Sequence, residues 1–207
     1  PRSTLFPYTT LFRSLDKNSS LFDHNIYVLC SDGDLQEGVS AEASSLAGTQ
    51  ELGNLIVIYD DNRISIEGDT HVSFTENVSA RYAAYGWHVE EVAAAKDGSV
   101  DIEALDAAIE RAKKESSKPS LIRLHTIIAW PAPKAQGTAK SHGSALGDEE
   151  VAATKVALGL NPDEKFAMPA DLLAHARKVM ERGAKAHADW NAELSKWKSA
   201  NAEKATL

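Results

Sequence analysis

Two polar side chains, Asp32 and Asn62, each follow a short apolar run, and they lie 30 positions apart. The runs 26–30 and 55–59 predict buried strands, and the stretch between them has the length of a crossover helix. This order predicts parallel neighbours in one sheet, so both side chains emerge at its carboxyl edge, where open α/β sheets bind ligands. A carboxylate and an amide oxygen suit Mg²⁺, which keeps its other positions for phosphate oxygens and water.

Gly33 follows Asp32 directly, and a glycine allows the backbone to approach a phosphate group closely. The stretch after it predicts a helix whose amino end points at the same edge, where free N–H groups and the macrodipole favour an anion. The carboxylate, the amide and the glycine together predict a site for a magnesium diphosphate.

Several blocks around these residues resemble the thiamine-diphosphate motif in the form that transketolases carry. The spacing from Asp32 to Asn62 fits that motif, and the resemblance extends from Ser19 to the C-terminus. One departure is Ser31, where many members of the family have glycine. In chain order, the matching blocks are Ser31-Asp32-Gly33-Asp34, Glu37-Gly38, Ser45-Leu46-Ala47-Gly48, Asp60-Asp61-Asn62, Ile64-Ser65-Ile66-Glu67-Gly68 and His142-Gly143-Ser144-Ala145-Leu146.

The resemblance implies two cofactors, thiamine diphosphate and Mg²⁺, with Ca²⁺ or Mn²⁺ as alternatives to magnesium. Asp32 and Asn62 would give side-chain oxygens to the ion, and Ile64 would give its backbone carbonyl. Gly33 would donate its amide to the diphosphate, and Ile66 would pack on the rings of the cofactor. All five residues stand at positions that match the family motif.

His142 is the candidate catalytic residue. The resemblance places it at the diphosphate and the reacting carbon, and an imidazole can donate a hydrogen bond and change charge near neutral pH. Glu37 and Glu42 resemble a pair at the subunit interface that links two cofactor sites. Asp34 and Asp61 are assigned to no ion, because a carboxylate repels a diphosphate unless it is turned away or paired.

A full-length member of this family would transfer a two-carbon ketol unit between sugar phosphates, as a cytoplasmic homodimer of the pentose phosphate pathway. The glutamate that activates the aminopyrimidine of the cofactor, and much of the sugar-phosphate site, lie in family segments that this sequence lacks. We therefore expect the 207-residue chain alone to be catalytically inactive.

Three alternatives stay open. A deoxyxylulose-phosphate synthase shares the metal motif, although Glu37-Gly38 and the block 45–48 fit transketolases better. A magnesium-dependent phosphoryl-transfer enzyme would use Asp32 as nucleophile and Asp34 as acid, which leaves Asn62 without a role. A non-catalytic binding fragment is the third alternative.

Composition argues against two classes of partner. The formal net charge of −8 does not favour nucleic-acid binding by phosphate neutralisation. No apolar run approaches the ~20 residues that cross a bilayer. The single cysteine, Cys30, lies within an apolar run, where we expect a buried core residue; a disulfide within the chain is impossible, which fits a reducing, cytoplasmic setting.

The order of apolar runs and amphipathic stretches predicts a doubly wound, mostly parallel α/β sheet, the thiamine-diphosphate-binding fold in incomplete form. The expected strands are 26–30, 55–59, 87–92 and 121–124. The expected helices are 40–47, 75–85, one capped by Asp101, 148–158, and a long one after Pro169. Residues 130–147, rich in Pro, Gly, Ala and Ser, predict a binding loop.

We expect three segments. Residues 1–14 resemble the conceptual translation of a DNA-sequencing adapter and are excluded as non-native. Residues 15–160 would form the partial thiamine-diphosphate and magnesium domain, and residues 161–207 a helical segment leading toward the next, absent domain. The apolar seam of the long helix predicts packing against another element.

Overall fold

The structure of the chain is a computed structural model that describes residues 20–206. The expectation for residues 1–14 lies outside the described part. The chain divides into two compact units. Within the described residues, one unit comprises 25–163 and the other comprises 20–24 with 164–206. Residues 20–24 thus group with the long C-terminal helix rather than with the sheet.

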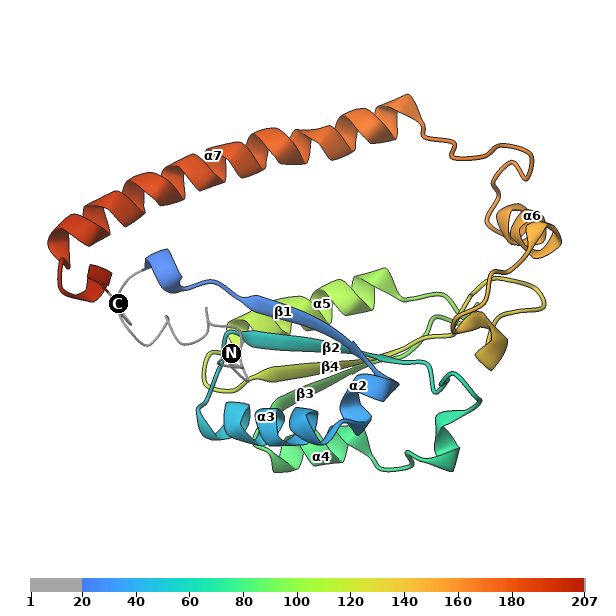
Figure 1. The fold of residues 1–207 in the computed structure, drawn as a ribbon, viewed down its shortest axis with the longest axis horizontal. Coiled ribbons are helices and arrows are strands. Elements are labelled where there is room, and N and C mark those ends of the chain that lie inside the picture. The colour runs from blue at the N-terminus through green and yellow to red at the C-terminus, as the bar shows by residue number, and fades with distance from the viewer. Residues whose placement is uncertain (1–19, 207) are drawn as a thin grey trace. The chain divides into compact units, whose positions relative to one another are not determined.

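A four-stranded parallel sheet forms the centre of the first unit (Figure 1). Its strands are β1 (Ile26–Ser31), β2 (Leu55–Asp61), β3 (His88–Val92) and β4 (Ser120–His125). The spatial order is β1-β2-β4-β3, so β4 lies between the two strands that precede it in sequence. Each expected strand is found, and the α/β fold class is confirmed.

Helices cover both faces of the sheet (Figure 1). The helices of one face are α2 (Asp32–Gln36), α3 (Gly38–Thr49) and α4 (Val78–Ala84), and α5 (Ile102–Lys114) covers the other. Alternation along β2 explains the two cores, because successive side chains of a strand point to opposite faces. Val57 and Tyr59 pack with α3 and α4, whereas Ile56 packs with α5.

The helix that we expected after Asp32 is divided into two. The five-residue α2 ends at Gln36, and the extended backbone of Glu37 separates it from α3. The small residues of α3 allow the close packing that the sequence predicted. A Cβ on Gly48 would lie 1.8 Å from the carbonyl oxygen of Tyr85, so only glycine fits at this crossing. Asp101 caps α5 as expected, accepting from the backbone N–H of Ala104.

The loop after β4 leads to α6 (Asp148–Ala157), which belongs to the first unit. In the second unit, α7 (Ala170–Ala200) contacts the short helix η1 (Ser20–Phe22). Trp190 Nε1 donates to the Leu21 carbonyl at 3.1 Å, and the Trp197 ring meets Phe22 edge-on at 5.1 Å. None of the described residues of α7 is buried, and Met180 in the expected seam is 71% exposed. Within the described part of the chain, the packing predicted for the seam is therefore limited to the part of α7 that contacts η1. Within residues 20–206, no helix is both long and apolar enough to cross a bilayer.

Candidate functional site

The carboxyl ends of β1, β2 and β4 meet at one edge of the sheet, and a cavity of about 620 Å³ opens there. The strand register explains the meeting, because Ser31 lies opposite Asp60 and Asp61 lies opposite His125. The polar side chains that line the cavity are those of Ser31, Asp34, Asp60, Asn62 and Thr126. This edge is the one that the sequence predicted as a binding site.

Asp32 is buried at this edge, with 2% of its surface exposed. Its Oδ1 accepts a hydrogen bond from the Tyr59 hydroxyl at 2.6 Å, and its Oδ2 accepts one from the backbone N–H of Arg63 at 3.1 Å. Burial raises the pKa of the Asp32 carboxyl, and these two hydrogen bonds oppose the rise. Within residues 20–206, no lysine, arginine or histidine forms an ion pair with it.

Asn62 lies beside Asp32, because the Arg63 N–H that contacts Asp32 belongs to the peptide bond between Asn62 and Arg63. The Asn62 Oδ1 accepts from the backbone N–H of Ile64 at 2.9 Å, and its Nδ2 donates to Asp60 at 3.3 Å. Arg63 adopts a left-handed backbone with φ of 60°, which is uncommon for a residue with a side chain. This turn directs its N–H at Asp32.

A second buried aspartate, Asp61, has an arginine partner, which Asp32 lacks within residues 20–206. Arg123 contacts its Oδ2 through Nε and Nη2, both at 2.7 Å, and His125 Nδ1 lies 3.0 Å from the same oxygen. The Asp61 side chain is 2% exposed. Of the two buried aspartates at this edge, one is therefore neutralised within the chain and the other is not.

Asp34 turns back onto the chain rather than toward a ligand. Its Oδ2 accepts from the backbone N–H and the hydroxyl of Ser31, at 2.8 and 2.9 Å. The expectation for Asp34 and Asp61, that they are turned away or paired, agrees with this geometry. A phosphoryl-transfer mechanism would require Asp34 as a free acid, and its engagement with Ser31 does not favour that alternative.

The other residues expected to contact the cofactor follow β1 and β2, where Gly33 and Ile66 are exposed and Ile64 is half-buried. A Cβ on Gly33 would meet nothing within 4 Å, so the space beside its backbone is open within the described chain. Ile64 pairs with Asp69 in an isolated bridge that closes the turn after β2. Ile66 lies in that turn and is 71% exposed.

The remaining predicted site residues lie farther along the chain. His142 is exposed and follows the short helix η3 (Ala139–Ser141), where its backbone N–H donates to Ala139. Glu37 and Glu42 are both exposed, Glu37 at the junction of α2 with α3 and Glu42 on α3. Within residues 20–206, these three side chains make no hydrogen bond or ion pair with the aspartates of the edge, so their roles stay predictions.

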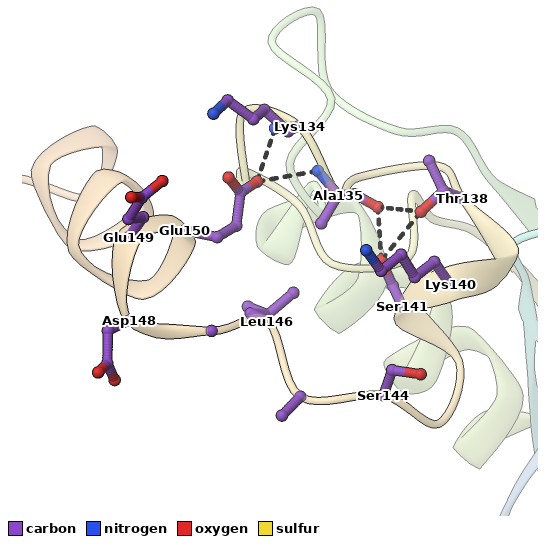
Figure 2. A pocket seen from close by; sticks show the side chains of 12 residues that line it. Lys134, Ala135, Thr138, Lys140, Ser141, Ser144, Leu146, Asp148, Glu149 and Glu150 are labelled. Carbon is purple, nitrogen blue, oxygen red and sulfur yellow. Dashed lines mark hydrogen bonds between the residues drawn. The ribbon is translucent and has the colours of Figure 1, made fainter.

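A buried acid, Glu150, ties α6 to the loop that precedes His142 (Figure 2). Its Oε1 accepts from the backbone N–H groups of Lys134 and Ala135, at 2.6 and 2.9 Å. The Ala135 carbonyl accepts in turn from Thr138 and Ser141. These residues line a second cavity of about 450 Å³. Sequence reasoning missed Glu150, because an acid in the first turn of a helix is ordinarily a surface residue.

The donor set at the sheet edge fits a hard divalent cation. A buried carboxylate without a cation partner is destabilised unless a positive charge comes from elsewhere, and each of its oxygens keeps a lone pair beyond the one hydrogen bond it accepts. Within residues 20–206, no three His, Cys, Asp or Glu residues gather as a metal cluster. An ion here would therefore draw on Asp32 with amide and carbonyl oxygens, as the sequence predicted.

The parallel sheet and its polar carboxyl edge define an α/β domain with a ligand site at the strand ends. The family described as "Transketolase, thiamine diphosphate binding domain" matches residues 9–207, and the chain belongs to this family. This finding confirms the resemblance seen in the sequence.

Individual relatives are similar along nearly all of the chain. The transketolase of Mycobacterium leprae is 50% identical over 192 residues, which cover 93% of this chain and 27% of that protein. The crystal structure of Pichia stipitis transketolase in complex with sedoheptulose 7-phosphate has a TM-score of 0.84 and 43% identity, covering 94% of this chain and 29% of that one. The structure of Campylobacter jejuni transketolase has a TM-score of 0.84 and 41% sequence identity. The match covers 95% of this chain and 30% of that one. This chain thus spans between a quarter and a third of the length of these relatives.

Proposed function

We propose that this chain is the part of a transketolase that holds magnesium thiamine diphosphate. The observation that carries the proposal is the contrast between the two buried aspartates: Asp61 is paired with Arg123 and His125, whereas Asp32 has no cation partner among residues 20–206. A divalent ion would supply the missing charge. The family match supports thiamine diphosphate as the molecule whose diphosphate shares that ion.

Three oxygens would hold the ion: the Asp32 carboxylate, the Asn62 amide oxygen and the Ile64 backbone carbonyl. Mg²⁺ is the expected ion, with Ca²⁺ or Mn²⁺ as substitutes, because all three donors are hard oxygens. The Asn62 amide is already oriented, since its Nδ2 donates to Asp60 and its oxygen faces the turn.

The Gly33 amide and His142 would bind the diphosphate, and Ile66 would pack on the cofactor rings. Open space beside Gly33 and the exposure of Ile66 and His142 leave these groups accessible. His142 would hold a proton and donate a hydrogen bond next to the reacting carbon. When bound, thiamine diphosphate supplies the carbanion and the electron sink.

The full-length protein would transfer a two-carbon ketol unit between sugar phosphates in the pentose phosphate pathway. The sugar-phosphate complex of the Pichia stipitis enzyme supports this substrate class. Glu37 and Glu42, both exposed, would meet a second subunit in a cytoplasmic homodimer. In this proposal residues 15–160 form the cofactor part, residues 161–207 lead toward a further domain, and the 207-residue chain alone is inactive.

Calorimetric titration of the chain with thiamine diphosphate and Mg²⁺ tests the proposal. We expect saturable binding that depends on Mg²⁺ and is lost in Asp32→Ala. Asp106→Ala, which removes an exposed acid of α5, is the matched control and should bind normally. Binding that survives Asp32→Ala, or that needs no divalent cation, would overturn the assignment. Ketol transfer by the purified chain above a blank would separately refute its inactivity.

A further inference from the structure

Tyr59 lies between the two buried aspartates of the sheet edge. Its hydroxyl is 2.6 Å from Asp32 Oδ1 and 3.4 Å from Asp61 Oδ1. The side chain is 2% exposed, and its ring packs in the core beneath α3 and α4. A phenol has a single O–H to donate, and the shorter distance assigns that hydrogen bond to Asp32.

The partners of Asp61 explain this preference. Asp61 receives Arg123 at 2.7 Å and His125 at 3.0 Å, so it is satisfied without the phenol. In the described part of the chain, Asp32 has two donors, the Tyr59 hydroxyl on one oxygen and the Arg63 N–H on the other. Two donors on different oxygens fix the rotation of a carboxylate, and the removal of either frees it.

We propose that Tyr59 is a positioning residue that fixes the Asp32 carboxylate in the orientation required to bind the divalent cation. The inference rests on the proposed function of Asp32. Groups that orient a metal ligand through a hydrogen bond typically change metal affinity by about 10- to 100-fold when they are removed. Tyr59 would act in this way without touching the ion.

The isosteric substitution Tyr59→Phe keeps the ring in the core and removes only the hydroxyl. The chain offers a matched control in Tyr82→Phe. Tyr82 is also 2% exposed and belongs to the same core, but its hydroxyl accepts from Ser44 at 3.0 Å and does not contact either aspartate. Circular dichroism of both variants checks that the fold is kept.

The first measurement needs no cofactor. Amide hydrogen exchange at Arg63 reports the hydrogen bond to Asp32 Oδ2. We expect Tyr59→Phe to speed exchange at this amide by about tenfold or more and Tyr82→Phe to leave it unchanged. Equal exchange at Arg63 in the unsubstituted chain and in Tyr59→Phe would overturn the inference.

The second measurement is calorimetric titration with Mg²⁺ in the presence of thiamine diphosphate. We expect the Mg²⁺ dissociation constant to rise about 10- to 100-fold in Tyr59→Phe and to stay unchanged in Tyr82→Phe. Normal affinity in Tyr59→Phe would refute the positioning role and leave the proposed function intact. Absence of Mg²⁺ binding in the unsubstituted chain would instead refute the proposed function, and the role of Tyr59 in cation binding with it.

Discussion

Arg123 on β4 and Asp61 on β2 form a buried ion pair across neighbouring parallel strands, with Nε and Nη2 both 2.7 Å from one carboxylate oxygen. The pair exists because β4 lies next to β2, an arrangement in which Tyr59 faces Arg123 and Asp61 faces His125 along the ladder. The Arg123 guanidinium compensates the charge of the buried Asp61 carboxylate. Asp32 is then the buried aspartate of this edge that lacks a cation partner within the described residues.

Arg123→Met should lower the free energy of unfolding by about 3 kcal/mol, because it leaves the buried Asp61 carboxylate with weaker compensation. Urea denaturation measures the loss. Arg111→Met is the control: Arg111 also forms a two-pronged pair, with Glu90, but its side chain is 53% exposed, so we expect a loss of less than about 1 kcal/mol. Equal losses in the two variants would show that burial does not set the strength of these pairs.

Glu150→Ala should destabilise the chain by about 1 kcal/mol, because the partly buried hydrogen bonds from the backbone N–H groups of Lys134 and Ala135 lose their acceptor. Glu150→Gln keeps an acceptor oxygen and should recover most of that loss. The comparison is made by urea denaturation at neutral pH. If the glutamine variant were as unstable as the alanine variant, the negative charge rather than the two hydrogen bonds would hold the loop.

The sequence predicted Cys30 as a buried core residue, but the structure leaves it half-buried at the edge cavity, where we still expect its thiol to react slowly. Burial raises the pKa of its thiol to about 12, and the carboxylates of Asp34, Asp32 and Asp60 contribute to the rise. Since the ordinary value is 9.0, the thiolate fraction at pH 8 falls by about 10³-fold on folding. Iodoacetamide labelling, followed by mass, should be slower in buffer than in 8 M urea by about tenfold or more, because the higher nucleophilicity of a high-pKa thiolate offsets part of the fall in its fraction. Comparable rates would place the thiol in an open environment.

The strands and most helices could be predicted because short local patterns of apolar and polar residues determine them. The apolar runs at 26–30 and 55–59 became β1 and β2, and the cap at Asp101 begins α5. The position of β4 between β2 and β3 could not be predicted, because consecutive strands are neighbours more often than not and nothing local marks the exception. The division of the first crossover at Glu37 was missed for a similar reason, since it depends on how α2 and α3 pack.

For the candidate site, too, the sequence predicted some of the residues but not the contacts that they make. Asp32 and Asn62 could be proposed from residue type and spacing, because both follow strands of the same sheet. The contacts that distinguish Asp32 from Asp61 could not be predicted. In the sequence, Tyr59, which donates to Asp32, is an ordinary core residue, and Arg123, which pairs with Asp61, is a single charge within a strand. Their contacts depend on register and strand order, which only the folded chain supplies.

Asp32→Asn should make the cofactor-free chain more stable, by about 1 kcal/mol, the usual size of a gain at a site where function opposes stability. The amide can accept from the Arg63 N–H and donate to the Tyr59 oxygen, so both contacts are kept while the buried charge is removed. The sign follows from the pKa. Burial raises the pKa of Asp32 above its ordinary 3.8, so the ionised form is less favourable in the folded than in the unfolded chain.

That penalty is absent below pH 3.8, the ordinary pKa that the unfolded chain keeps, and grows as the pH rises through the raised pKa of the folded chain. Urea denaturation at several pH values should therefore show the advantage of Asp32→Asn at pH 7 and its loss in acid. Excess Mg²⁺ with thiamine diphosphate should reverse the order at neutral pH, because a ligand stabilises only the chain that binds it. A cofactor-free Asp32→Asn chain less stable than the unsubstituted one at pH 7 would mean that Asp32 is held for structure, and that its missing cation is no sign of a metal site.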